Sequence, residues 1–208
     1  MEEVLDVYQR PYDPKRPVVC LDEARRQLIS ETRTGFIDRA GIEHVDYEYK
    51  REGVVEIFMV AQPLAGRREI VVTESHNSHE WAKVVGRIAE EWYADAELIT
   101  LVQDNLSAHR KAAFYEVFEP KRARSILQRL AFVYTPKHGS WLNMAEIELS
   151  VVTRQGLRGR VASQDEFEQQ VQAWVKQRND NSSKVDWQFT AQDARIKLKR
   201  LYPTIING

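Results

Sequence analysis

The chain has 208 residues, enough for one globular domain with a sizeable core, and its 43% hydrophobic and 29% charged residues are ordinary for a soluble protein. No apolar run reaches the ~20 residues of a membrane helix, and the acidic start Met-Glu-Glu lacks the apolar core of a signal peptide. We therefore expect a cytoplasmic protein. The single cysteine, Cys20, excludes an internal disulfide and fits a reducing compartment.

The formal net charge of −1 hides an asymmetry between the two halves of the chain. Residues 1–100 contain 13 Lys and Arg against 20 Asp and Glu, whereas residues 101–208 contain 17 against 11. Any surface that binds a polyanion is therefore expected in the second half. A chance imbalance on solvated faces is the competing explanation, and charge alone does not choose between the two.

The first half of the chain is rich in strand patterns. The continuous apolar run at 18–21 predicts a buried strand that ends at Asp22. Alternating apolar and charged residues predict an exposed antiparallel strand at 45–50, and Glu52-Gly53 is a plausible hairpin turn. Two more strands are expected after this turn, at 54–60 and 69–73.

Helices alternate with strands in the second half. Helical spacing predicts a helix at 79–94, and the apolar run 98–103 predicts a buried strand that ends at Asp104. Residues that can cap a helix predict further helix starts at Ser107, Ser140, Ser163 and Thr190. A short helix at 122–130, a strand at 132–134 and helix ends at Gly156 and Pro203 complete the pattern. This order predicts an α/β protein whose mixed sheet carries helices on both faces.

Three carboxylates are predicted to lie on buried elements. Asp22 and Asp104 each follow a buried strand, and Glu146 lies on a helix that is apolar nearly all round. Unpaired buried charge is costly, so three such acids favour a shared divalent cation. Taken singly, Asp22 and Asp104 are more simply explained as turn or salt-bridge residues. Mg²⁺ prefers oxygen ligands, and two such ions can clamp the attacking and leaving oxygens of a phosphodiester.

Neighbouring polar residues leave alternatives open. Glu148 could replace Glu146 as the ligand, because helical periodicity does not choose between them. Glu23, next to Asp22, is interpreted as a surface charge. His109 is expected one turn into a helix, from which it could face the same site. The sequence contains neither a complete zinc-ligand pattern nor a phosphate-binding glycine loop.

Three segments resemble the catalytic domain of a DDE transposase, specifically the bacterial insertion-sequence branch of the mariner superfamily. They are Val18-Val-Cys-Leu-Asp-Glu23, Leu101-Val-Gln-Asp-Asn-Leu-Ser-Ala-His109 and Tyr134-Thr-Pro-Lys-His-Gly-Ser-Trp-Leu-Asn-Met-Ala-Glu146. The C-terminal segments Asp186-Trp-Gln-Phe-Thr and Asp193-Ala-Arg are also similar to that group. The resemblance covers nearly the whole chain, and its third segment is long and specific.

The resemblance implies a ribonuclease H-like mixed five-stranded sheet with helices on both faces, formed by residues 1–203. Asp22, Asp104 and Glu146, rather than Glu148, would be the catalytic residues and the ligands of two Mg²⁺ or Mn²⁺ ions. Family members cut DNA at transposon ends and join the freed 3′-OH to a target, usually a TA dinucleotide. Water and then the 3′-OH act as nucleophiles. The resemblance further implies a homodimer that acts on bacterial chromosomal or plasmid DNA, with no membrane partner.

Two departures from the family pattern matter. Between Asp104 and Glu146 lie 41 residues, more than in the usual bacterial pattern, and the excess is expected at 119–129. Family members also carry an N-terminal helix-turn-helix region, which is expected to be absent because the catalytic motifs begin almost at Met1. We therefore expect a second reading frame, fused to or paired with an upstream helix-turn-helix frame, or else a truncated copy.

DNA contact is expected from the second half of the chain. Basic residues near the catalytic helix are predicted to bind DNA together with His109, and they are Lys137, Arg154, Arg158 and Arg160. Such residues can instead be partners of helix dipoles, and those of the last helix are interpreted as a solvated face. Two other functions remain open: a ribonuclease H-like nuclease without a role in transposition, and a non-enzymatic truncated regulator of a full transposase.

Overall fold

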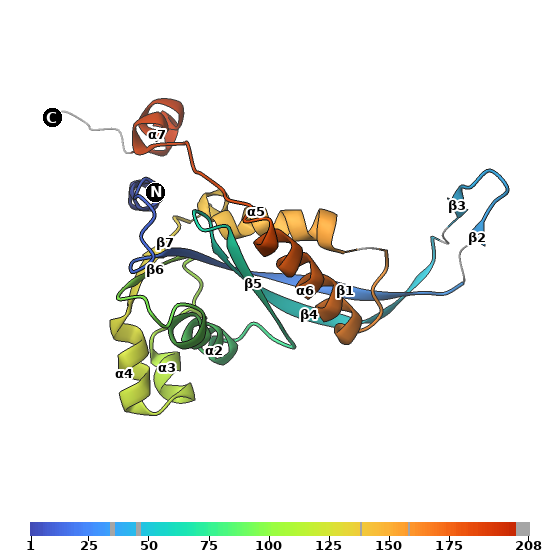
Figure 1. Cartoon of the computed structure of the whole chain (residues 1–208), viewed down its shortest axis with the longest axis horizontal. Helices are drawn as coiled ribbons and strands as arrows, with labels where there is room; N and C mark the ends of the chain where they lie inside the picture. Colours follow the sequence, from blue (N-terminus) through green and yellow to red (C-terminus); the bar gives the residue numbers. More distant parts are fainter. Residues whose placement is uncertain (34–35, 45–46, 138, 158, 203–208) are drawn as a thin grey trace.

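The fold is built around one five-stranded sheet with the strand order β5-β4-β1-β6-β7 (Figure 1). The computed structural model describes residues 1–202 except 34–35, 45–46, 138 and 158. Antiparallel pairing joins β1 to β4 and β4 to β5, whereas β6 is parallel to both β1 and β7. The strands are β1 (Val18–Glu31), β4 (Tyr49–Gln62), β5 (Arg67–Thr73), β6 (Ile99–Gln103) and β7 (Leu130–Tyr134). The predicted mixed five-stranded sheet is confirmed.

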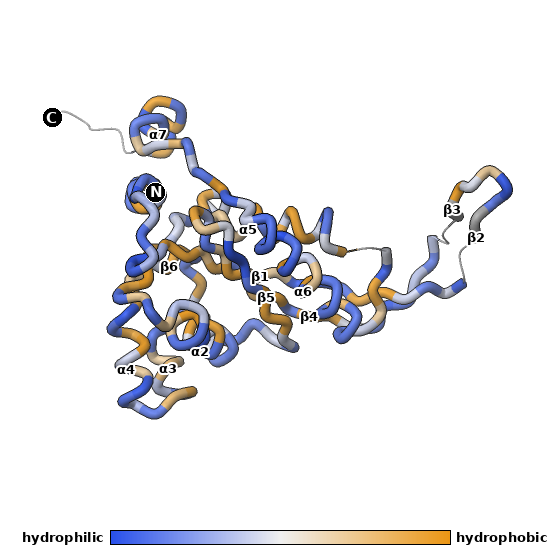
Figure 2. Tube along the Cα trace, viewed as in Figure 1, coloured by the Kyte–Doolittle hydropathy of each residue, from blue (hydrophilic) through white to orange (hydrophobic). Residues whose placement is uncertain are grey.

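Helices cover both faces of this sheet, each over its own hydrophobic cluster. One face carries α1 (Glu2–Tyr8), α5 (Met144–Val151), α6 (Gln164–Asp180) and α7 (Ala191–Lys197). The other face carries α2 (Ser78–Arg87), α3 (Ala112–Val117) and α4 (Pro120–Gln128). Figure 2 shows hydrophobic positions gathered along the central strands. No helix among the described residues is long and apolar enough to cross a bilayer.

Short elements extend or connect the larger ones. A π-helical turn at Ile88–Trp92 continues α2, and another at Val152–Gly156 continues α5. Single 3₁₀ turns lie at Ser140–Leu142, before α5, and at Lys199–Leu201, after α7. A small two-stranded sheet, β2 (Phe36–Ile37) with β3 (Glu43–His44), lies beyond the far ends of β1 and β4 (Figure 1).

Two strand predictions are wrong in the same region. β1 does not end at Asp22 but continues to Glu31, and residues 49–62 form one strand with no turn at Glu52-Gly53. A β-bulge explains the misleading pattern. Leu28 pairs with Gly53 but Ile29 pairs with Arg51, so Glu52 is an extra residue. Gly53 has a φ of 141°, which strongly favours glycine, and its presence imitated a hairpin turn.

Several helix boundaries also differ from the prediction. The helix expected from Ser107 begins at Ala112, so residues 104–111 form a loop that contains His109. Ser140 starts a 3₁₀ turn, and Asn143 caps α5 instead. The helix α1 was not predicted. The expected helices at 79–94, 122–130 and from Ser163 and Thr190 are present with shifted ends, whereas the expected stop at Pro203 lies outside the described residues.

Candidate metal centre

The parallel pairing of β1 with β6 brings two of the predicted carboxylates to the same level of the sheet. The paired residues run from Val18 with Thr100 to Cys20 with Val102. Two residues beyond the last pair are Asp22, inside β1, and Asp104, directly after β6, which therefore lie side by side. Asp104 is the first residue after β6, as predicted, whereas Asp22 lies inside a long strand.

The environment of Asp22 favours its uncharged form. Side chains alternate along β1, so Asp22 lies on the same face as Cys20, towards α5. Burial, with a contribution from the negative charges of Glu23, Asp104 and Glu146, raises the pKa of Asp22 to about 7, although a hydrogen bond from the Glu23 amide lowers it. The carboxylate of Asp22 is therefore close enough to those of Asp104 and Glu146 to be repelled by both.

Asn143 fixes the start of α5 against β1. Its Nδ2 donates to the carbonyl of Leu21 at 2.8 Å, and its Oδ1 accepts from the amide of Ala145 at 3.1 Å. The first contact reaches the residue before Asp22, and the second caps the helix that carries Glu146 in its first turn. One buried side chain therefore sets the position of Glu146 relative to Asp22.

Asn143→Ala is expected to lower the free energy of unfolding by about 2 kcal/mol, because it removes a helix cap and leaves the buried Leu21 carbonyl without its donor. Asn143→Ser keeps an oxygen that can cap α5 but cannot reach Leu21, so its loss should be smaller. Urea unfolding followed by circular dichroism measures both variants. An unchanged unfolding midpoint for Asn143→Ala would contradict this role.

Glu146 and Glu148 have opposite environments on α5. Glu146 is exposed, whereas the side chain of Glu148 is 2% exposed. The Oε1 atom of Glu148 accepts from Nη2 of Arg68 at 2.6 Å, and Nη2 of Arg178 lies 3.3 Å from both carboxylate oxygens. Glu148 is therefore a paired structural charge that ties α5 to β5 and α6, which is one of the two roles that the sequence left open.

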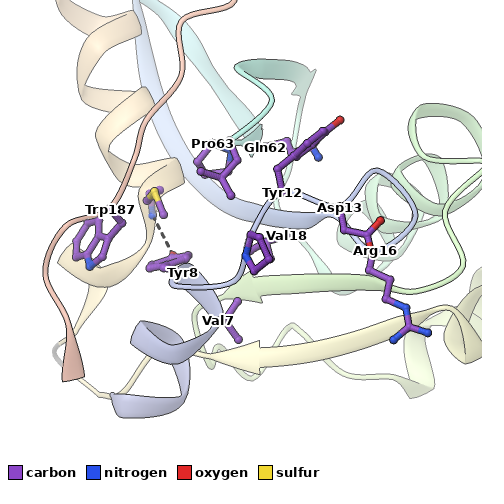
Figure 3. Close-up of a pocket in the computed structure, with 12 residues that line it drawn as sticks. Val7, Tyr8, Tyr12, Asp13, Arg16, Val18, Gln62, Pro63 and Trp187 are labelled. Carbon is purple, nitrogen blue, oxygen red and sulfur yellow. Dashed lines mark hydrogen bonds between the residues drawn. The ribbon is translucent and has the colours of Figure 1, made fainter. Parts of the chain in front are cut away.

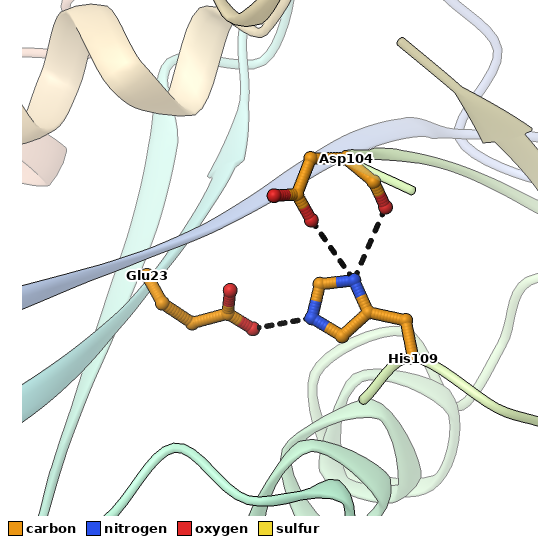
Figure 4. Close-up of side chains that lie close together, drawn as sticks. All are labelled: Glu23, Asp104 and His109. Carbon is orange, nitrogen blue, oxygen red and sulfur yellow. Dashed lines mark hydrogen bonds and ion pairs between the residues drawn. The ribbon is translucent and has the colours of Figure 1, made fainter. Parts of the chain in front are cut away.

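Glu23 is not the surface charge that the sequence suggested. Because it alternates with Asp22, it faces the opposite side of the sheet, towards α2, where its side chain is 8% exposed. Its Oε1 lies 2.8 Å from Nε2 of His109. Nδ1 of the same ring lies 3.0 Å from Oδ1 of Asp104 and 3.1 Å from the Asp104 carbonyl (Figure 4). The sequence prediction missed this contact because it ended the strand at Asp22, whereas β1 continues to Glu31 and includes Glu23.

The ligand atoms of Glu23, Asp104 and His109 lie within 4.8 Å of one another, a spacing that could also hold a metal ion. In the metal-free protein the ring carries a positive charge. Burial lowers the pKa of His109, but the hydrogen bonds and the negative charges of Asp104 and Glu23 outweigh burial and raise it to about 10. A metal ion bound to this ring would have to displace one of its protons. The three residues therefore form an ion-paired cluster beside the carboxylates of Asp22 and Glu146.

The predicted DNA contacts are divided among different environments. Lys137 and Arg154 are exposed, and Arg154 bonds to the backbone and hydroxyl oxygens of Ser150. Arg160 is bound to Glu31 at 2.6 Å. Arg158 lies outside the described residues. His109 has a side chain only 2% exposed, so its placement does not support a direct contact with DNA.

A pocket between α1, the start of β1 and the end of β4 contains none of the predicted carboxylates (Figure 3). Tyr8 from α1 lines it, and its hydroxyl donates to the carbonyl of Leu142 at 2.7 Å. The amide of Met144 lies 3.4 Å from the same hydroxyl. The unpredicted helix α1 therefore supports the turn that leads into α5.

Comparison with known families agrees with this arrangement. The profile of the family described as DDE superfamily endonuclease matches residues 17–168, which include Asp22, Asp104 and Glu146. The chain belongs to the DDE superfamily endonucleases. Comparison with curated proteins gives no match.

Solved structures share the fold of this DDE endonuclease domain. The crystal structure of the Mos1 mariner paired end complex with Mn is 14% identical, with a TM-score of 0.54, over 88% of this chain and 54% of that chain. The Mos1 Strand Transfer Complex is 12% identical, with a TM-score of 0.54, over 84% of this chain and 51% of that chain. The chain spans about half the length of these proteins, and the predicted ribonuclease H-like fold is confirmed.

Proposed function

We propose that the chain is the catalytic domain of a transposase that cleaves DNA strands and transfers the 3′-OH end to a target. The observation that supports this most strongly is the convergence of Asp22, Asp104 and Glu146 from β1, the end of β6 and α5. We place it in the bacterial insertion-sequence branch of the mariner superfamily, because the segment Tyr134–Glu146 is long and specific to that group. Its place of action would be the bacterial cytoplasm.

The donor set fits divalent cations. Asp22, Asp104 and Glu146 offer carboxylate oxygens, the ligands that Mg²⁺ and Mn²⁺ prefer, and a cation would relieve the repulsion of Asp22 by the other two. We propose two Mg²⁺ or Mn²⁺ ions there, which would activate the nucleophile and stabilise the leaving oxygen. Around them, Asn143 holds α5 against β1, while the ion pairs of Glu148 keep the rest of the helix in place.

The DNA partner would approach from the side of α5 on which Glu146 is exposed. Lys137 precedes this helix and Arg154 follows it, and both are exposed, so they are suited to contact phosphates. Arg158 and Arg160 follow Arg154 in the sequence and belong to the same proposed surface. We further propose that a helix-turn-helix region recognises the transposon ends, that the target is a TA dinucleotide and that the protein acts as a homodimer.

Nicking of supercoiled plasmid tests the proposed chemistry. The protein is expected to convert supercoiled DNA to the open circle in the presence of Mn²⁺, and to lose this activity when EDTA removes the metal. Paired transposon-end substrates then test strand transfer, which a simple nuclease would not perform. Absence of nicking in the chain joined to a helix-turn-helix region, with Mn²⁺ present, would overturn the proposal.

Mn²⁺ is expected to raise the melting temperature more at pH 8 than at pH 6. The pKa of Asp22 is about 7, so protons compete with the metal below that pH. The stability of the metal-free protein should change in the opposite direction. It is expected to fall as the pH rises from 3.8, the ordinary pKa of the carboxyl, to about 7, because Asp22 ionises first in the unfolded chain. Thermal melts of wild type and Asp22→Asn measure both effects. A pH-independent Mn²⁺ shift in wild type would contradict the assignment of Asp22.

A further inference from the structure

The cluster of Glu23, His109 and Asp104 joins the two faces of the sheet at the candidate metal centre. Glu23 comes from the middle of β1, Asp104 from the end of β6, and His109 from the loop before α3. In Figure 4 the imidazole ring lies between the two carboxylates. We infer that Glu23 and His109 are positioning residues, which hold the carboxylate of Asp104 in the orientation that binds the catalytic metal. This inference rests on the proposed function.

The contacts of the ring show which groups donate. Nε2 faces a carboxylate oxygen of Glu23, and Nδ1 faces the carboxylate and the carbonyl of Asp104. These oxygens are acceptors, so both ring nitrogens must carry hydrogen. The ring is therefore a bridge of positive charge between two negative groups. The hydrogen bonds of the ring run to Glu23 and to the Asp104 carbonyl, and the bond to Glu23 is charge-assisted. The Asp104 carboxylate is held by an ion pair, in which Oδ1 lies 3.0 Å from Nδ1 without the geometry of a hydrogen bond, and this contact restricts the rotation of the Asp104 side chain.

The imidazole ring of His109 is held in place by a side chain of α2. It stacks on Trp81 with ring centres 5.2 Å apart and an angle of 19° between the planes. Trp81 is fully buried, and its Nε1 donates to Oε1 of Gln103 at 3.0 Å. Gln103 is the residue before Asp104. The chain of contacts from Glu23 through His109 and Trp81 thus returns to the strand end that carries Asp104, which leaves little freedom at any step.

This arrangement assigns different tasks to the two oxygens of Asp104. Oδ1 is buried and lies 3.0 Å from Nδ1 of His109 as an ion pair, and the other oxygen points away from the ring (Figure 4). That second oxygen is the one left for a metal ion. Partners that orient a metal ligand typically change metal affinity or activity by 10- to 100-fold when they are removed. The same size of effect is expected here for Glu23, although its own side chain faces away from Asp22 and Glu146.

The test compares two buried glutamates on the same sheet face. Glu23→Gln removes the charge that holds His109. The matched control is Glu56→Gln, because Glu56 is similarly buried but pairs with Arg25 at 2.6 Å and His76 at 3.1 Å, with no link to Asp104. Calorimetric titration of the full chain with Mn²⁺, without DNA, gives the metal affinity, and thermal melts show whether each variant is folded.

We expect Glu23→Gln to weaken Mn²⁺ binding by about 10- to 100-fold and Glu56→Gln to leave it unchanged. Unchanged affinity in folded Glu23→Gln, or equal weakening in Glu56→Gln, would overturn the inference. If Glu23→Gln does not fold, His109→Gln removes the same bridge and is judged by the same criteria. Nitrogen coupling to bound Mn²⁺ in electron spin echo spectra would also overturn it, since His109 would then be a ligand. A wild type that binds no Mn²⁺ would instead overturn the proposed function itself.

Discussion

Asp104→Asn is expected to reduce Mn²⁺-dependent nicking by about 10³-fold or more, because a metal that stabilises the transition state contributes several kcal/mol, and each 1.36 kcal/mol changes the rate tenfold. Asparagine has nearly the same shape but lacks the charge that a divalent cation needs. Asp22→Asn and Glu146→Gln should have effects of similar size. The rate of open-circle formation, measured at saturating Mn²⁺, gives the comparison.

The matched control for this loss is Glu116→Gln. Glu116 is a half-exposed carboxylate that pairs with His79 and Arg110 on the α2 and α3 side of the sheet, away from α5. Its replacement should leave nicking within about twofold of wild type, since exposed ion pairs contribute little to stability. Full nicking activity in folded Asp104→Asn would show that Asp104 is not a metal ligand.

Glu148→Ala is expected to destabilise the protein by about 3–5 kcal/mol, because it leaves Arg68 as a buried charge with backbone carbonyls but no anionic partner. For a chain of this size the loss corresponds to a melting temperature lower by roughly 10 °C. Glu146→Ala should leave the melting temperature of the metal-free protein almost unchanged, since Glu146 is exposed. Below its melting temperature, folded Glu148→Ala should still nick DNA, whereas Glu146→Ala should not.

A second variant separates the charge from the packing. Replacing Arg68 with Met together with Glu148→Leu removes both charges and keeps similar volume, so much of the lost stability should return. Thermal melts of the single and double variants give the coupling between the two side chains. If Glu148→Ala melts like wild type and is inactive while Glu146→Ala is active, the roles of the two glutamates are reversed.

The sequence predicted the strands of the sheet best where the chain is continuously buried. The runs before Asp22 and Asp104 gave correct strand positions, because both faces of these strands are covered by helices. It failed beyond Asp22, where β1 continues with polar residues such as Arg25 and Gln27. Those side chains pair across to β4, and only the partner strand makes that segment extended.

The candidate site was predicted only in part for a related reason. The three acids were visible because each follows or interrupts an apolar run. Glu23 was misjudged because its burial depends on the position of His109, which the loop 104–111 brings back against β1. Asn143 was missed because its partner, the Leu21 carbonyl, is distant in sequence. Long-range contacts of this kind leave no periodic signal in the chain.

The order of the carboxylates along the chain bears on when the centre can exist during synthesis. Asp22 and Asp104 meet only after β1 pairs with β6, and the third acid arrives with α5. Parallel pairing between distant segments forms slowly, after local helices and hairpins. A ribosome-bound chain therefore has no complete centre until α5 has emerged. Translation that stops before α5 would release polypeptides with two of the three acids, which could not assemble the full candidate centre.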